Sequence, residues 1–333
     1  MWFDEWITRC QRVPLDLSLD LYVEELDDFR EVLMERGKQL LEYILTQFGH
    51  KVRSLFVIGA PSSLLPILQL PPSSSLLALE EMSLTILGDG LDTHEGRVAF
   101  FPAKVEVLLD APKLTRVELN NTSLLEFLGL PAEQLTSLKV NAEDVEVDPA
   151  MLVGILPRCK QLVALEICLP FEDSIGFSTT LSIFLPTLRS LEVSCFNAAH
   201  NILRCITTSL LEQLSLRYHS QDLDSLFTDL TEFQQRSSTP LSCLNLYISY
   251  GANHDMEINT EKVIGMLSLF PAIHSLEIHP RAPLHPDLLI QVVTYTEGHH
   301  VLPNLKELVF LWSFHGGGRV RRRSVMDYLA CKR

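Results

Sequence analysis

One short apolar pattern, which recurs ten times between Val52 and Phe310, constrains the fold more than any other feature of the sequence. In each copy an apolar residue is followed by apolar residues three and five positions later. The copies begin at Val52, Leu79, Leu114, Leu135, Leu162, Leu188, Leu211, Leu241, Ile273 and Leu305. Because the last two apolar residues are two positions apart, the pattern suits a short strand that buries alternate side chains rather than a long helical stripe. The sequence therefore predicts a series of short strands.

The intervals between the copies leave room for a second element in most repeats. Leu114 and Leu135 are 21 positions apart, and Leu79 and Leu114 are 35 apart. These lengths lie within or just above the spacing of leucine-rich repeats. Helical periodicity fills several intervals, at residues 149–156, 224–235, 260–269 and 286–297. We therefore expect an α/β leucine-rich-repeat solenoid, a horseshoe with parallel strands on its concave side and helices on its convex side.

The first fifty residues carry a different pattern. Residues 14–21 alternate between apolar and polar side chains, which is typical of a half-buried strand. Residues 22–50 place apolar side chains three or four positions apart on either side of Gly37, which predicts one interrupted helix or two. The sequence thus divides into an N-terminal strand and helical cap at 1–50, the solenoid at 51–315, and a basic, disordered tail at 316–333.

The repeats depart from the usual leucine-rich-repeat signature at one position. That signature places an asparagine or cysteine eight positions after the first apolar residue, where the side chain bonds neighbouring turns. Here the position holds unrelated residues, among them Thr122, Glu143, Pro170 and Phe196. The asparagine ladder is missing, so we expect irregular repeats.

The charge of the chain excludes some classes of partner. A formal net charge of −15, with six basic residues and one acidic residue after Gly316, leaves the rest of the chain strongly acidic and argues against nucleic acid binding. The longest uncharged run, 54–79, contains four prolines, so we expect a strand, a loop and a short apolar segment rather than a membrane span. Seven scattered cysteines without a CxxC pair indicate reduced thiols, and we expect a cytoplasmic or nuclear location.

Three features together resemble a known family. The first is a proline followed by apolar residues two, five and seven positions later, as in residues 112–119. The second is the irregular spacing of the repeats. The third is the start of the chain, where tryptophans precede the sequence Pro-Leu-Asp-Leu-Ser-Leu at residues 14–19. Over residues 1–312 the chain resembles the F-box and leucine-rich-repeat proteins of mushroom-forming fungi. In that family a helical F-box docks the Skp adaptor of a cullin ubiquitin ligase, and the repeats hold the substrate.

The F-box itself is the main departure from that family. It would precede the Trp2 region and is not found in the sequence. The resemblance therefore implies either a truncated or mis-started member, or a repeat protein that does not dock to a ligase.

No motif in the sequence predicts catalysis or a cofactor. We find no phosphate-binding loop, dinucleotide fingerprint, HExxH or nucleophile elbow. His274, His279 and His285 lie near one predicted strand, but their spacing does not suit a tetrahedral metal site together with Glu277. We expect no catalytic, metal-binding or cofactor-binding residues.

The most informative surface is the concave side of the predicted sheet. There the residue four positions into each repeat points outward, and several of these residues are glutamates. Together with neighbouring positions, the candidate partner-binding residues are Glu118, Lys139, Glu166, Glu192, Arg217, Tyr247 and Glu277. One explanation of these charges is that they only keep an exposed sheet soluble and block edge pairing. The functional alternative is a mainly acidic groove for a basic protein segment, with Tyr247 as an aromatic anchor.

These observations predict a non-enzymatic protein-recognition module. The resemblance implies the substrate-binding repeat region of an F-box-type ubiquitin-ligase receptor, with the Skp adaptor and cullin as further partners if an F-box lies upstream. The alternative is a free-standing leucine-rich-repeat scaffold without a ligase connection. An enzyme with a catalytic groove would need a buried cluster of titrating residues, which the spacing does not reveal.

Overall fold

The computed structural model forms two compact units, Met1–Leu162 and Val163–Arg333, here called the N-terminal and C-terminal units. The division falls within the predicted solenoid, and each unit is described by itself. The structure describes residues 5, 13–22, 30–70, 76–87, 105–120, 125, 127–142, 150–168, 182–195, 199–218, 223–248, 260–280, 301–310 and 323–324.

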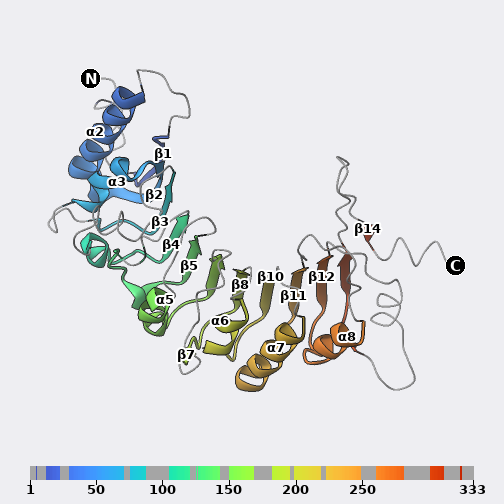
Figure 1. Ribbon diagram of the computed structural model, residues 1–333. Coiled ribbons are helices and arrows are strands. Elements are labelled where there is room, and N and C mark those ends of the chain that lie inside the picture. The colour runs from blue at the N-terminus through green and yellow to red at the C-terminus, as the bar shows by residue number, and fades with distance from the viewer. Residues whose placement is uncertain are drawn as a thin grey trace. The chain divides into compact units, whose positions relative to one another are not determined.

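The N-terminal unit contains parallel strands whose spatial order follows their order in the chain (Figure 1). They are β1 (Leu15–Asp20), β2 (Val52–Gly59), β3 (Glu81–Ile86), β4 (Arg116–Asn120) and β5 (Ser137–Asn141). The predicted strand within residues 14–21 is thereby confirmed as β1.

The C-terminal unit repeats this arrangement. Its parallel strands, in spatial order, are β6 (Ala164–Cys168), β8 (Ser190–Cys195), β10 (Gln213–Tyr218), β11 (Cys243–Ile248), β12 (Ser275–Pro280) and β13 (Glu307–Phe310). Of the predicted tail, only β14 (Arg323–Ser324) is described, and it pairs antiparallel with β13. A separate small pair joins β7 (Ile183–Phe184) to β9 (Ile206–Thr207).

The strand register confirms the sequence pattern. The second apolar residue of each copy faces its counterpart in the next strand. In the N-terminal unit these residues are Leu55, Met82, Val117 and Leu138. In the C-terminal unit they are Leu165, Leu191, Leu214, Leu244, Leu276 and Leu308. All are buried, and each buried leucine contributes about 2 kcal/mol of transfer free energy.

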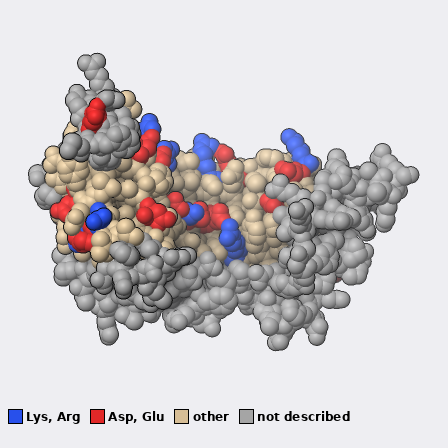
Figure 2. All heavy atoms as spheres, turned by 90° about the horizontal axis from the view of Figure 1, so that it is seen from above, with Lys and Arg blue, Asp and Glu red and all other residues tan. Residues whose placement is uncertain are grey.

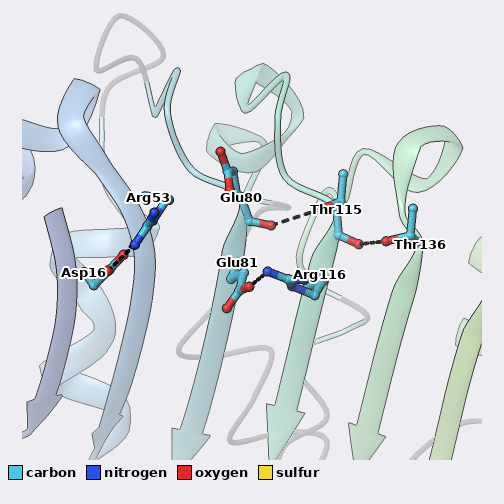
Figure 3. Close-up of polar contacts among 7 residues, drawn as sticks. All are labelled: Asp16, Arg53, Glu80, Glu81, Thr115, Arg116 and Thr136. Atoms are coloured by element: carbon cyan, nitrogen blue, oxygen red, sulfur yellow. Dashed lines mark hydrogen bonds and ion pairs between the residues drawn. The ribbon is translucent and has the colours of Figure 1, made fainter. Parts of the chain in front are cut away.

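A repeated hydrogen-bond pattern at the start of the strands fixes this register. The carbonyl of Glu80 accepts the N–H groups of Thr115 and Arg116 at 3.0 and 3.1 Å. In the next repeat the carbonyl of Thr115 accepts the N–H groups of Thr136 and Ser137, and the hydroxyls of both threonines reinforce the pattern (Figure 3). Backbone groups therefore join successive repeats at the start of their strands.

Helices connect the strands on the return paths. They are α2 (Arg30–Phe48), α3 (Pro61–Leu68), α5 (Ala150–Ile155), α6 (Ala199–Cys205), α7 (Leu223–Ser237) and α8 (Thr260–Ser268). Shorter 3-10 turns are η1 (Gly49–Lys51), η2 (Val107–Asp110), η4 (Ala132–Gln134) and η5 (Leu156–Arg158). In the C-terminal unit, α6, α7 and α8 lie on one side of the strands (Figure 1). Three predicted helices are thus confirmed as α5, α7 and α8, while residues 286–297 lie outside the described residues.

Two expectations about helices were wrong in part. Gly37 does not interrupt α2, which continues on both sides of it. The glycine instead makes room for Leu21, since a Cβ at Gly37 would come within 2.7 Å of the Leu21 Cδ2 atom. The predicted loop after β2 is the helix α3, which tolerates Pro61 because that residue occupies the first turn. Pro66 lies inside α3.

Candidate recognition surface

In each unit the residues that alternate with the buried leucines lie on the opposite face of the sheet, called here the open face. This alternation follows from the two-residue period of a strand. On β4 and β5, Glu118 and Lys139 face each other in register and are half-buried, while Val117 and Leu138 beside them are buried. The predicted outward direction of these side chains is therefore confirmed.

A ladder of interacting side chains crosses the open face of the C-terminal unit. The Arg217 Nη2 atom on β10 lies 3.1 Å from a carboxylate oxygen of Glu192 on β8. The same guanidinium lies over the ring of Tyr247 on β11, 5.3 Å from its centroid. On the other side of Tyr247, the ring of His279 on β12 stacks at 4.0 Å with an interplanar angle of 19°. The ladder ends where the His279 Nε2 atom lies 2.8 Å from Glu277 Oε1.

The strand register explains why these groups meet. Arg217 is the direct neighbour of Tyr247, and Tyr247 is the direct neighbour of His279. Cross-strand neighbours on one face have Cβ atoms about 5 Å apart, so planar side chains stack on each other. Because Arg217 and His279 come from opposite sides of β11, they cover the two faces of the Tyr247 ring. A partner is left with the edge and the hydroxyl of Tyr247, not the ring face expected of an aromatic anchor.

The surroundings also affect the acidity of the Tyr247 hydroxyl. Partial burial raises the pKa of Tyr247 above its ordinary value, because the phenolate loses contact with water. The carboxylates of Glu277 and Glu192 raise this pKa further, whereas the guanidinium of Arg217 lowers it. The phenol is thus held in its neutral form and is able to donate a hydrogen bond.

The open face of the N-terminal unit carries charges in pairs. The Lys139 Nζ atom lies 3.3 Å from Glu118 Oε1, which also accepts a hydrogen bond of 3.1 Å from the Asn120 amide. Closer to the start of the strands, Arg116 pairs with Glu81 (Figure 3). The space-filling view accordingly has acidic and basic side chains interspersed rather than gathered by sign (Figure 2).

A further pair joins the first two strands. The Arg53 Nε atom donates to Asp16 Oδ1 at 2.9 Å (Figure 3). The hydrogen bond from Arg53 holds the pKa of the exposed Asp16 carboxyl below its usual value. Such exposed pairs contribute little to stability, but they hold side chains in place and cancel charge locally.

The structure sorts the seven predicted residues into two groups. Glu192, Arg217, Tyr247 and Glu277 belong to one ladder in the C-terminal unit, with Glu166 beside Glu192 in register. Glu118 and Lys139 form a separate pair in the N-terminal unit. His279 completes the ladder. It is not one of the seven candidates, although its position six residues into the repeat, like that of Tyr247, predicts that it lies on the same face.

The histidines do not form a metal cluster with their neighbours in the part of the chain that the structure describes. No group of three or more potential ligands is found there. His274 is exposed at the start of β12, His279 is engaged with Glu277, and His285 lies outside the described residues.

No protein-family model matches this chain, and a search of the curated proteins found no match to it. Among the described residues, no helix is long and apolar enough to cross a membrane.

Proposed function

We propose that the chain is a leucine-rich-repeat protein of the horseshoe type that recognises another protein and has no catalytic function. The observation that carries this proposal is the ladder from Glu192 to Glu277, in which charged and aromatic side chains are held in register on an open sheet face. Preorganised polar groups of this kind suit binding, because little side-chain entropy remains to be lost when a partner arrives.

The charge on this face favours a basic partner segment. The described positions of the C-terminal open face hold one guanidinium, that of Arg217, among four carboxylates: Glu166, Glu192, Glu277 and Glu307. The acidic chain as a whole, at −15, adds to the attraction over longer range. A partner with lysines or arginines gains electrostatic complementarity here, which favours both association rate and specificity.

The biological setting that we propose is the substrate-binding region of an F-box-type ubiquitin-ligase receptor in the cytoplasm or nucleus. Its support is the likeness of residues 1–312 to the fungal F-box and leucine-rich-repeat proteins. Affinity purification of this chain, and of any longer in-frame form, tests the proposal by probing for the Skp adaptor and cullin. If neither the Skp adaptor nor the cullin were recovered with either form of the chain, the ligase role would be contradicted. The proposal of a protein-recognition module would then remain without a ligase connection.

The recognition function itself is tested with a fluorescent octalysine peptide as the basic probe. Replacing Glu192, Glu277 and Glu307 by glutamine removes three charges from the open face without changing side-chain size. We expect the affinity for the probe, measured by fluorescence anisotropy at low salt, to fall at least tenfold.

A matched control separates the local surface from the overall charge. Glu35, Glu133 and Glu232 are exposed on α2, η4 and α7. Their replacement by glutamine changes the net charge by the same amount and should reduce affinity much less. Equal losses in the two variants would mean that the probe senses net charge alone, and the proposed surface would be wrong.

A further inference from the structure

Strand β2 places two apolar side chains on the open face of the N-terminal unit, where the neighbouring strands carry small or polar ones. Phe56 is 38% exposed and Ile58 is 36% exposed. They are two residues apart on one strand and therefore share a face. The direct neighbours of Phe56 are Ser18 on β1 and Ser83 on β3. Because both serines are short, the phenylalanine ring stands above its surroundings.

Short polar groups also flank Ile58. Its direct neighbours are Asp20 on β1 and Thr85 on β3. The Asp20 carboxylate accepts the N–H of Tyr22 at 3.0 Å, and the Thr85 hydroxyl accepts a hydrogen bond of 3.3 Å from the amide of Asn120. These polar groups are engaged within the unit, so the apolar pair forms a small patch of about two side chains, bounded by groups that already have partners.

The Asp20 carboxylate beside Ile58 keeps its negative charge, because its bond to a backbone N–H does not neutralise it, whereas the next charges cancel one another. Asp16 is paired with Arg53 on the β1 side, and Glu81 is paired with Arg116 on the β3 side (Figure 3). Glu118 and Lys139 form the next pair. A partner segment therefore meets no unpaired cation or anion among these six residues, and the single Asp20 carboxylate disfavours an acidic segment without selecting a strongly basic one. An apolar centre with an already satisfied polar rim is the usual form of a binding hot spot.

We propose that Phe56 and Ile58 form a second recognition site, which takes an extended, uncharged segment of a partner protein through one large apolar side chain. The paired charges around the patch, with the single Asp20 carboxylate beside it, select this occupant, because a strongly basic segment is drawn to the more numerous carboxylates of the C-terminal unit and an acidic one is repelled by the chain as a whole. The serines beside Phe56 leave room for the partner side chain to lie against the ring. This site does not rest on the proposed acidic surface.

The test uses a random peptide library displayed on phage and selected on the full chain. The variant carries Phe56→Ser and Ile58→Thr, which gives β2 the residues that β3 already has at the same register positions, Ser83 and Thr85. The array itself shows that such residues are accommodated on this face, so the variant should fold. Circular dichroism and thermal unfolding check that it does.

The control variant, Phe184→Ser, removes an equally large side chain that is 50% exposed on β7 in the C-terminal unit. We expect selected peptides to share an apolar residue in an uncharged context, to lose at least tenfold in affinity for the β2 variant, and to bind the Phe184 variant normally.

Three results would overturn the proposal: no enriched peptide, a basic consensus, or peptides that bind the β2 variant as well as the original chain. Peptides that lose affinity for the glutamine variant of Glu192, Glu277 and Glu307 would instead support the acidic surface. The two proposals therefore fail separately.

Discussion

At the residue scale, the position of Tyr247 makes its ionisation a direct report on the ladder. The phenol has a raised pKa through burial first and then through Glu277, while Arg217 acts in the opposite direction. We therefore expect Glu277→Gln to lower the pKa of Tyr247 and Arg217→Gln to raise it. Absorbance titration of tyrosinate, referenced to Tyr247→Phe, measures both shifts. Shifts of the same sign in the two variants would contradict the observed stack.

The raised pKa of Tyr247 also has a consequence for stability. An unfolded tyrosine has a pKa of about 10, and the pKa of the folded Tyr247 is higher. The protonated Tyr247 therefore contributes fully to the free energy of unfolding below the pKa of the unfolded tyrosine. This contribution is lost as the pH rises through the pKa of the folded protein. The effect lies at alkaline pH and leaves neutral-pH stability unchanged.

At the scale of elements, one ion pair connects two neighbouring helices of the C-terminal unit. Arg204 at the end of α6 pairs with Asp229 on α7, whose side chain is fully buried. Among the described residues, the Oδ2 atom of Asp229 has no hydrogen-bond partner. Asp229 thus depends on Arg204 for compensation of its buried charge.

This dependence predicts an asymmetry between two substitutions. Arg204→Ala leaves an uncompensated buried carboxylate and should cost about 3 kcal/mol of unfolding free energy. Asp229→Asn removes that charge but keeps a hydrogen-bond acceptor for Arg204, so it should cost about 1 kcal/mol. Urea denaturation followed by circular dichroism compares the two variants. A larger loss for Asp229→Asn would show that attraction within the pair, rather than the cost of burying the carboxylate, dominates.

The strands of this protein could be predicted from sequence more completely than its helices. A strand is specified by a two-residue alternation, and Leu244 and Leu246 on β11 show it directly. On α2, by contrast, Leu33 and Leu40 have the periodicity of buried residues, yet they are 51% and 39% exposed. Periodicity identifies an apolar side of a helix but not how much of it the neighbouring repeat covers.

The candidate surface was predictable in position but not in its contacts. The spacing of the repeats alone is enough to place Glu192, Arg217 and Tyr247 on one face of the sheet. Which carboxylate pairs with which cation depends on rotamers, and the stacking of His279 on Tyr247 depends on two side chains turning toward each other. A pattern of residue types therefore overstated the acidity of the N-terminal open face, because it counted Glu118 without its partner Lys139.

At the scale of the whole molecule, the two proposed sites differ in the force that holds the partner. The C-terminal open face has an excess of carboxylates, whereas the charges around Phe56 and Ile58 are paired apart from Asp20. Attraction between charges is screened over about 30 Å at 0.01 M salt but over only about 3 Å at 1 M. Contact between apolar surfaces does not weaken with added salt in this way.

We therefore expect salt to separate the two sites in one protein sample. The affinity for octalysine should fall steeply between low and high salt, while the affinity for a peptide selected on Phe56 and Ile58 should stay within about twofold, since screening acts only on charges. Anisotropy titrations at matched ionic strengths measure both, and the β2 variant should leave the octalysine salt dependence intact. If both affinities fell in parallel, the two probes would be binding one charged surface, and the apolar patch would have no recognition role of its own.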